Sequence, residues 1–359
     1  MNHVPRFTFD PKATRSGISI IIPCLNEETH IKKCVDSALA FAAPSDLAIE
    51  VVVLDGMSTD QTWVLLQENY ARHPRVKLIR NPGRSQSAAL NLALPQAEGE
   101  WIMRLDAHSF YPPDYLEECL ATARRTGADN VGGLFITLPG GDSYEARLVQ
   151  AMTTHKFGVG NSGFRVNEGE GPADTVPYGF YRREVFDRLG GFDERLLRAQ
   201  DYEFNRRILA QGGQIWRNPR IQVHYHNQRT LAKFYRKQLV LEAPYNAYLW
   251  YVAPYAFAWR HGITGAFTAG VLAGAILSKV HLWLATAYFS VLGLYCILAI
   301  LSAAQQAVRY REILHFFCLP PCFFLYHFLH GLGVLFGLAR LATGTAPVQR
   351  VSTGVGMRG

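Results

Sequence analysis

The sequence predicts an α/β domain built on a mostly parallel, Rossmann-like sheet, followed by interfacial helices and C-terminal transmembrane helices. Two observations predict this fold class. In the first half of the 359 residues, short β-branched runs alternate with segments of helical periodicity, the pattern of a parallel sheet covered by helices. The last third contains long apolar stretches almost without charge, the pattern of helices in a lipid bilayer.

Strands and helices alternate from the first β-branched run onward. A short apolar run between polar segments, which is typical of a buried strand, recurs four times. The strands are expected at 18–22, 49–54, 76–79 and 101–105, with helices between them at 27–41, 61–72 and 85–97. Strands joined by helices form a parallel sheet, and such sheets bind ligands at the carboxyl ends of their strands.

The rest of the α/β domain is less regular. The segment 158–173 is rich in glycine and polar residues and is interpreted as a mobile loop. Beyond it the pattern predicts a helix closed by a glycine pair and two short strands, at 199–211, 214–216 and 221–224.

The C-terminal part is strongly apolar. Only Glu242 and Glu312, of 29 acidic residues, follow Glu203. A bilayer core of about 30 Å needs about 20 helical residues, a length that the uncharged segment 281–304 exceeds. Two further apolar segments lie at 263–278 and 313–339. The last contains Pro320 and Pro321, and either crosses the bilayer or re-enters it by turning at these prolines.

A basic and aromatic segment joins the two parts. Residues 229–262 combine lysine and arginine with nine phenylalanine, tyrosine and tryptophan residues, which favours helices in the lipid headgroup layer over an ordinary core element. The domain boundaries expected are therefore an N-terminal lead 1–17, the α/β domain 18–228, interfacial helices 229–262, a transmembrane region 263–339 and a flexible tail 340–359.

The net charge and the lack of a targeting signal limit which partners and which location are expected. A net charge of +7 is compatible with nucleic-acid binding, but the excess arises because acidic residues are missing from the apolar half, so nucleic acid is not expected as a partner. Residues 1–17 lack the apolar core of a secretory signal. The α/β domain is therefore expected on the cytoplasmic face of a membrane.

Polar residues follow the first two expected strands and open the third helix. Asn26 and Glu27 follow Pro23, where a turn residue and a helix-dipole partner are the ordinary explanation. Asp55 comes directly after the second strand, a position from which an acid binds a nucleotide base or ribose. Arg84 precedes a helix start rich in small residues, which suits a diphosphate or simply close packing.

Carboxylates and imidazoles also follow later elements. Asp106 and His108 alternate after the fourth strand, so both side chains share a face and form a candidate Mg²⁺ or Mn²⁺ site; solvent exposure is the alternative. Asp201 opens a helix, where it is either a dipole partner or a catalytic base. His224 and His226 alternate along a strand, and an additional metal ligand or plain exposure explains them.

These pieces, in this order, resemble the family 2 inverting glycosyltransferases, which have a GT-A fold. The resemblance covers about residues 17–228, in the motifs "IIPCLNEE", "VVVLDGMSTDQT", "GRSQSAALNLAL", "RLDAH" and "VPYGFYRREVFDRLGGFDERLLRAQDYEFNRRI". With "GNSGFR" before the last motif and apolar spans after it, the sequence looks most like the succinoglycan-type β-1,3-glucosyltransferases of exopolysaccharide assembly.

The resemblance implies a nucleotide-binding role for the early candidates. Pro23, Asn26 and Glu27 would lie along the nucleotide. Asp55 would bind the uracil base, and Arg84 would face the pyrophosphate or the base.

The resemblance also assigns the later candidates. Asp106 and His108 occupy the D-x-D position of the family and would hold a divalent cation and the nucleotide, with His224 at a position that sometimes joins the metal. Asp201 matches the catalytic aspartate of an E-D pair, although Gln200 replaces the glutamate.

The implied activity is an inverting, metal-dependent transfer of one sugar, glucose from UDP-glucose, to a hydroxyl of a polyprenyl-diphosphate-linked saccharide. No Gln-x-x-Arg-Trp motif, which processive synthases use to hold the growing chain, follows Asp201. The expected place is the bacterial inner (plasma) membrane, with the catalytic domain on the cytoplasmic face. Two alternatives remain, a polyprenyl-phosphate glycosyltransferase and an inactive nucleotide-sugar-binding membrane scaffold.

Overall fold

The chain divides into two compact units. The computed structural model describes residues 4–7, 15–42 and 44–349. The first unit comprises Met1–Leu138 and Ser162–His226, and the second comprises Pro139–Asn161 and Asn227–Gly359. The first unit differs from the expected domain 18–228 chiefly by the segment 139–161, which packs with the C-terminal helices instead.

The first unit is built on one eight-stranded sheet, which confirms the predicted mostly parallel α/β domain. The strand order is β3-β2-β1-β4-β7-β5-β8-β6; β7 runs antiparallel to both of its neighbours and β6 antiparallel to β8. The strands are β1 (Arg15–Cys24), β2 (Ala48–Asp55), β3 (Val76–Arg80), β4 (Gly99–Arg104), β5 (Asn130–Leu138), β6 (Gly171–Pro172), β7 (Phe180–Arg182) and β8 (Ile215–His226).

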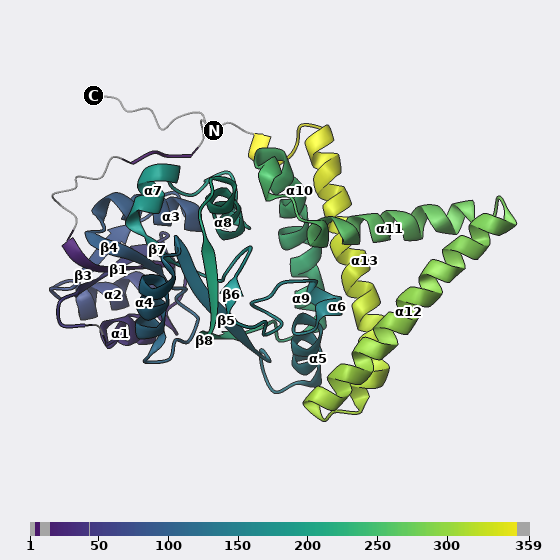
Figure 1. The fold of residues 1–359 in the computed structure, drawn as a ribbon, viewed down its shortest axis with the longest axis horizontal. Helices are drawn as coiled ribbons and strands as arrows, with labels where there is room; N and C mark the ends of the chain where they lie inside the picture. Colours follow the sequence, from purple (N-terminus) through teal and green to yellow (C-terminus); the bar gives the residue numbers. More distant parts are fainter. Residues whose placement is uncertain (1–3, 8–14, 43, 350–359) are drawn as a thin grey trace. The chain divides into compact units, whose positions relative to one another are not determined.

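Helices cover both faces of this sheet, as Figure 1 shows. Alternate residues of β1 face opposite layers: Ile20 packs with the α1, α2 and α4 side, and Ile21 with the α3, α7 and α8 side. Burial on both faces explains the nearly continuous apolar sequence of β1 and β2. The helices are α1 (Ile31–Leu39), α2 (Thr62–Tyr70), α3 (Gln86–Ala93) with a 3₁₀ turn at Leu94–Gln96, α4 (Tyr115–Thr126), α7 (Arg183–Leu189) and α8 (Gln200–Ala210).

The second unit is helical. The long helix α13 packs against α10, α11, α12 and α5. The helices are α5 (Tyr144–Thr153), α6 (Lys156–Val159), α9 (Leu231–Lys237), a π-helical stretch (Gln238–Glu242), α10 (Ala243–Val252), a 3₁₀ turn (Pro254–Ala256), α11 (Trp259–Leu277), α12 (Leu282–Tyr310), α13 (Leu314–Ala342) and a final 3₁₀ turn (Pro347–Gln349).

Within the described residues, α12 and α13 are long and apolar enough to cross a membrane, judged by length and composition alone. The most apolar part of α12 is only 6% buried, so other described helices do not cover it. Helix α13 continues through Pro320 and Pro321, and the turn that a re-entrant segment would need is absent from this helix. The segment 229–262 is helical as predicted, and α10 is buried against α13.

Several elements differ from the sequence-based predictions. The first helix begins at Ile31 rather than residue 27, because loop residues after β1 are hydrogen-bonded to the loop after β2. The two strands expected at 214–216 and 221–224 form the single strand β8, which shifts its register against β5. The sequence analysis did not predict α4, β5, α5 and β7. The apolar residues of α4 nevertheless recur at helical spacing, at positions 115, 116, 119, 120 and 123, so this helix had a signal in the sequence.

One glycine in β5 is required by close packing, which gives a testable prediction. A Cβ on Gly133 would lie 1.6 Å from the carbonyl oxygen of Ile221 in β8, at the register shift. Gly133→Ala is therefore expected to destabilise the protein by about 1–3 kcal/mol or more, measured by urea unfolding. Gly169→Ala is the matched control, because a Cβ there meets nothing within 4 Å. Equal stability of the two variants would contradict this packing.

Candidate active site

The candidate site lies where neighbouring parallel strands end. Cys24 at the end of β1 is paired in register with Asp55 at the end of β2, and Ile21 of β1 is paired with Arg104, the last residue of β4. The loops that follow these three strands therefore meet at one edge of the sheet. Pro23, paired with Leu54, lies one residue before the end of β1.

Asp55 is a fully buried carboxylate with one satisfied oxygen. Its Oδ2 accepts hydrogen bonds from Arg80 Nη1 at 2.6 Å and from the Ser58 amide at 3.1 Å. Its Oδ1 is buried and has no hydrogen-bond partner among the described residues. The Arg80 guanidinium lies 4.5 Å from the centre of the Trp63 ring, which fixes its position. A buried acceptor of this kind suits a donor group from a ligand, such as the N–H of a base.

Asn26 and Glu27 join the loops after β1, β2 and β4. Asn26 has a φ of 55° and accepts the Thr59 amide on its Oδ1 at 2.8 Å. The Glu27 amide donates to Thr62 Oγ1 at 2.8 Å, and its Oε1 lies 2.8 Å from His108 Nδ1. Asn26 and Glu27 therefore connect the loop after β1 to the segments that follow β2 and β4.

Arg84 lies at the start of α3 and is exposed. Its φ is 55°, and its Nη2 lies 3.5 Å from the carbonyl oxygen of Met57, in the loop after β2. The structure thus places the exposed Arg84 guanidinium close to the loop that follows Asp55.

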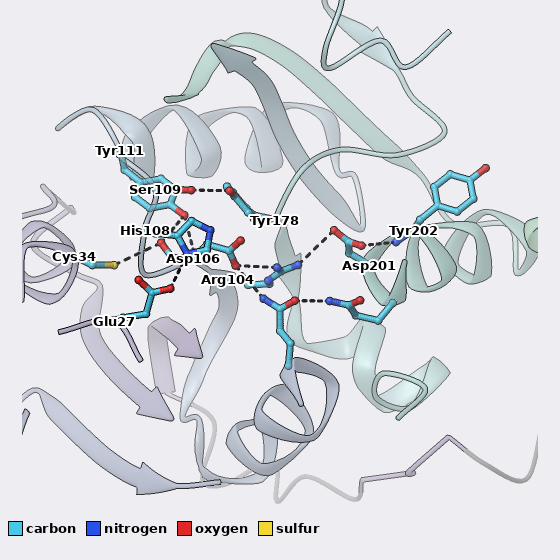
Figure 2. A network of polar contacts seen from close by, with 12 residues as sticks. Glu27, Cys34, Arg104, Asp106, His108, Ser109, Tyr111, Tyr178, Asp201 and Tyr202 are labelled. Carbon is cyan, nitrogen blue, oxygen red and sulfur yellow. Dashed lines mark hydrogen bonds and ion pairs between the residues drawn. The ribbon is translucent and has the colours of Figure 1, made fainter. Parts of the chain in front are cut away.

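Arg104 joins the two most important candidate acids. Figure 2 shows its guanidinium between Asp106 and Asp201, which are far apart in the sequence. Arg104 Nη2 donates to Asp106 Oδ1 at 2.9 Å, and Nη1 lies 3.5 Å from Asp201 Oδ2. The other oxygen of Asp201 accepts the Tyr202 amide at 3.0 Å. One buried cation therefore holds the D-x-D loop and the start of α8 together.

The ionisation of Arg104 follows from this arrangement. Only 4% of its side chain is exposed, and burial lowers the pKa of a guanidinium. The carboxylates of Asp106 and Asp201 outweigh burial and hold the pKa of Arg104 above its ordinary value. Arg104 is therefore charged, and removal of one carboxylate would leave a buried cation partly uncompensated, which is costly.

The loop that carries Asp106 and His108 is fixed from several sides. The Asp106 amide donates to the Tyr111 hydroxyl at 2.7 Å, and Ser109 Oγ lies 2.7 Å from the Tyr178 hydroxyl. The Cys34 thiol lies 3.8 Å from the carbonyl oxygen of Asp106. Its burial, and to a smaller extent the nearby acids, raises the pKa of this thiol to about 12, so the thiol stays neutral. His108 itself is 49% exposed.

His224 reaches the same loop by its backbone. Its amide donates to the Phe110 carbonyl at 3.1 Å, and the Phe110 amide donates back at 3.3 Å. β8 thus lies beside the loop that contains His108. Among the described residues, however, no three histidine, cysteine, aspartate or glutamate side chains gather in a way that could hold a metal ion.

Asp106 and His108 are still suited to a cation that phosphate groups of a substrate also coordinate. A carboxylate and an imidazole are suitable ligands for Mn²⁺ and tolerable for Mg²⁺, and phosphate oxygens would complete the coordination. Asp106 uses its Oδ1 for Arg104 and for Gln86 Nε2, at 2.9 and 3.0 Å, so Oδ2 is the oxygen that would face such an ion.

Sequence reasoning missed three polar residues of the site: Arg80, Gln86 and Arg104. Arg80 and Arg104 are the last residues of β3 and β4, so the expected position of ligands at strand ends was a signal for both. Gln86 carried no such signal, because its role depends on a contact with α8.

The chain matches a model of a known protein family. The family described as "Glycosyl transferase family 2" matches residues 19–190. The succinoglycan biosynthesis protein ExoA of Rhizobium meliloti (strain 1021) is 32% identical over 224 residues, which cover 62% of this chain and 67% of that protein.

A second relative matches over nearly the whole chain. It is the dolichyl N-acetyl-α-D-glucosaminyl phosphate 3-β-D-2,3-diacetamido-2,3-dideoxy-β-D-glucuronosyltransferase of Methanococcus voltae, 25% identical over 339 residues, 90% of this chain and 97% of that protein. Among solved structures, the mannosyltransferase PcManGT of Pyrobaculum calidifontis, in complex with GDP-Man and Mn²⁺, has a TM-score of 0.54 and 20% identity, and covers 93% of this chain and 88% of its own. The last likeness confirms the GT-A type of fold.

Proposed function

The chain belongs to the family 2 glycosyltransferases, and we propose that it moves one glucose from UDP-glucose to a hydroxyl of a polyprenyl-diphosphate-linked saccharide in exopolysaccharide assembly. The observation that carries this proposal is the Arg104 bridge, which joins a carboxylate suited to a metal–diphosphate complex to a carboxylate suited to a base.

Asp201 acts as the base. An acceptor hydroxyl has a pKa far above neutral, so it needs a proton acceptor as it attacks the anomeric carbon. Asp201 is one-third exposed, at the first turn of α8, and its Oδ2 is held by Arg104. The hydroxyl proton passes to this carboxylate while the bond from the anomeric carbon to the diphosphate oxygen breaks. A single displacement inverts the configuration of that carbon.

The donor binds across the ends of β1, β2 and β4. Asp55 Oδ1 accepts the N–H of uracil, since it is buried and has no partner among the described residues. Pro23, Asn26 and Glu27 line the nucleotide, and Arg84 meets the diphosphate. A divalent cation, Mg²⁺ or Mn²⁺, with Asp106 and His108 as its protein ligands and the donor's diphosphate oxygens completing the coordination, would offset the charge of the leaving UDP. His224, the third ligand predicted from the sequence, reaches this loop by its backbone, and it does not gather with these two side chains among the described residues. The mannosyltransferase of similar fold is in complex with Mn²⁺.

The acceptor is attached to a lipid. The relative from Methanococcus voltae, by its name, transfers a sugar to a dolichyl-phosphate-linked N-acetylglucosamine. The exposed apolar length of α12 and the span-length helix α13 would anchor the chain in the inner membrane. Helix α9 carries Lys233, Arg236 and Lys237, which suit a polyprenyl diphosphate or anionic headgroups at the cytoplasmic face.

This function is tested with the full-length purified protein in detergent micelles. With radiolabelled UDP-glucose and Mn²⁺, label is expected in an undecaprenyl-diphosphate-linked monosaccharide and not in undecaprenyl phosphate, because only the first offers a hydroxyl. Mild acid should then release a β-linked disaccharide. Label in undecaprenyl phosphate would instead favour the polyprenyl-phosphate glycosyltransferase, and UDP binding without turnover on any acceptor would favour the inactive scaffold.

A further inference from the structure

Helix α3 holds the loop that leads into α8. Asn91 donates its side-chain amide to the carbonyl oxygen of Phe192 at 2.9 Å and accepts the Phe192 amide on its Oδ1 at 2.8 Å. Ser87 Oγ donates to the carbonyl oxygen of Leu196 at 3.1 Å. Asn91 and Ser87 are both buried, so these bonds are shielded from water. The position of Asp201 therefore depends on α3 as well as on α8.

Two glutamines extend this connection to the acids. Gln86 is the first residue of α3 and Gln200 is the first residue of α8. Gln86 Nε2 donates to Asp106 Oδ1 at 3.0 Å, and Gln86 Oε1 accepts from Gln200 Nε2. Gln200 is only 5% exposed, so its amide has little access to water as an alternative hydrogen-bond partner. Gln200 is also the residue next to Asp201.

The direction of these two bonds is fixed by chemistry. The carboxylate of Asp106 only accepts hydrogen bonds, so the NH₂ group of Gln86 must face it. The carbonyl oxygen of Gln86 then faces residue 200, which must be a donor. Asparagine, glutamine, lysine or arginine meets this requirement, and an ionised glutamate does not.

We propose that Gln86 and Gln200 form a positioning pair that sets the base Asp201 relative to the diphosphate-binding Asp106, and that Gln86 makes a donor obligatory at position 200. The pair runs parallel to the Arg104 bridge, so Asp106 is linked to the start of α8 by two routes. This explains why glutamine replaces the glutamate of the family's E-D pair. The inference rests on the proposed function, in which Asp201 is the base.

Gln200→Glu tests the polarity of the pair. A carboxylate at position 200 would face the carbonyl oxygen of Gln86, and if Gln86 turned its amide, that oxygen would face Asp106 instead. In both cases two acceptors meet. We expect kcat, measured as release of the nucleoside diphosphate from the sugar donor, to fall about tenfold. The KM for the donor should change less than about threefold, because Arg104 still holds Asp106.

A second substitution should rescue the first. Lysine at position 86 donates to both Asp106 and Glu at 200, and Gln86→Lys combined with Gln200→Glu leaves the net charge of the cluster unchanged. The double variant is expected within about threefold of the wild-type kcat. Gln200→Met, which removes the donor without adding charge, should lose activity and should not be rescued by Gln86→Lys. Gln67→Glu, on the exposed side of α2, is the matched control and should match the wild type.

The experiment uses the full-length protein, with circular dichroism to confirm that each variant is folded. Wild-type kcat for Gln200→Glu, or a double variant no more active than Gln200→Glu alone, would overturn the pair. Gln200→Met covers the case in which Gln200→Glu does not fold, and wild-type kcat for Gln200→Met would also overturn it. Release is measured with UDP-glucose and with GDP- and dTDP-sugars. If the wild type uses only one of the latter, the proposed donor fails and the pair is judged on the donor that it uses.

Discussion

Asp201→Asn is expected to lower kcat for sugar transfer to a lipid-linked hydroxyl by about 10²–10⁴-fold, the usual contribution of a general base. Asparagine keeps the size of the side chain and can still accept the Tyr202 amide, although its NH₂ group then faces Arg104. It cannot take the proton of the acceptor. The KM for the donor should change little, because the nucleotide contacts that we propose lie at the ends of β1, β2 and β4. Steady-state transfer of radiolabel from UDP-glucose measures both parameters.

The control for this variant is Asp46→Asn, an exposed acid in the loop before β2. It should retain wild-type kcat. If Asp201→Asn also retained wild-type kcat and isolated polyprenyl phosphate were glucosylated, the acceptor would be a phosphate that needs no base, and the hydroxyl-directed reaction would be refuted.

Loss of the proposed cation site should be almost as severe. Asp106→Asn can keep an acceptor oxygen toward Arg104 and Gln86 while an NH₂ group replaces Oδ2, which would face the ion. We expect kcat/KM to fall at least about a hundredfold, since charge neutralisation of a leaving diphosphate contributes several kcal/mol. His108→Ala should also lose activity, and EDTA should remove the wild-type activity until Mn²⁺ or Mg²⁺ is added back.

Binding measurements separate this loss from a general defect. Isothermal titration of UDP should show tighter binding with Mn²⁺ for the wild type and no such gain for Asp106→Asn. His73→Ala, in the turn between α2 and β3, is the control and should behave as the wild type. Metal-independent turnover that is unchanged in Asp106→Asn and His108→Ala would refute the metal assignment.

Much of the sheet could be predicted because buried parallel strands have a simple signature. β1 and β2 are continuous apolar runs that end at a proline or an acid, so their existence and their functional ends were visible in the sequence. β7 was not visible. It is three residues long and antiparallel, and its place between β4 and β5 is determined by long-range pairing rather than by its own composition.

Motifs in the sequence predicted several of the residues that lie at this edge of the sheet, but they indicated neither Arg80, Gln86 and Arg104 nor the contacts that these make. Asp106 and Asp201 were recognised from motif positions. Nothing in the sequence indicated that the buried Arg104 joins them, because the contact with Asp201 links residues far apart in the chain. The same holds for Gln200, because its position in the motif gives no sign of its hydrogen bond to Gln86, which lies far away in the sequence.

The interruption of the α/β unit by residues 139–161 has a consequence for how the protein is made. A ribosome delivers the chain from the N-terminus, and domains generally fold as units during synthesis. Ala151 and Met152 of α5 are buried in a cluster with Leu319 and Phe323 of α13, which are synthesised much later. The apolar face of α5 therefore lacks these partners until α13 has been synthesised, which is well after β8, the last strand of the sheet, has been made. A chaperone or the bilayer surface would be suited to cover the apolar face of α5 until α13 has been synthesised.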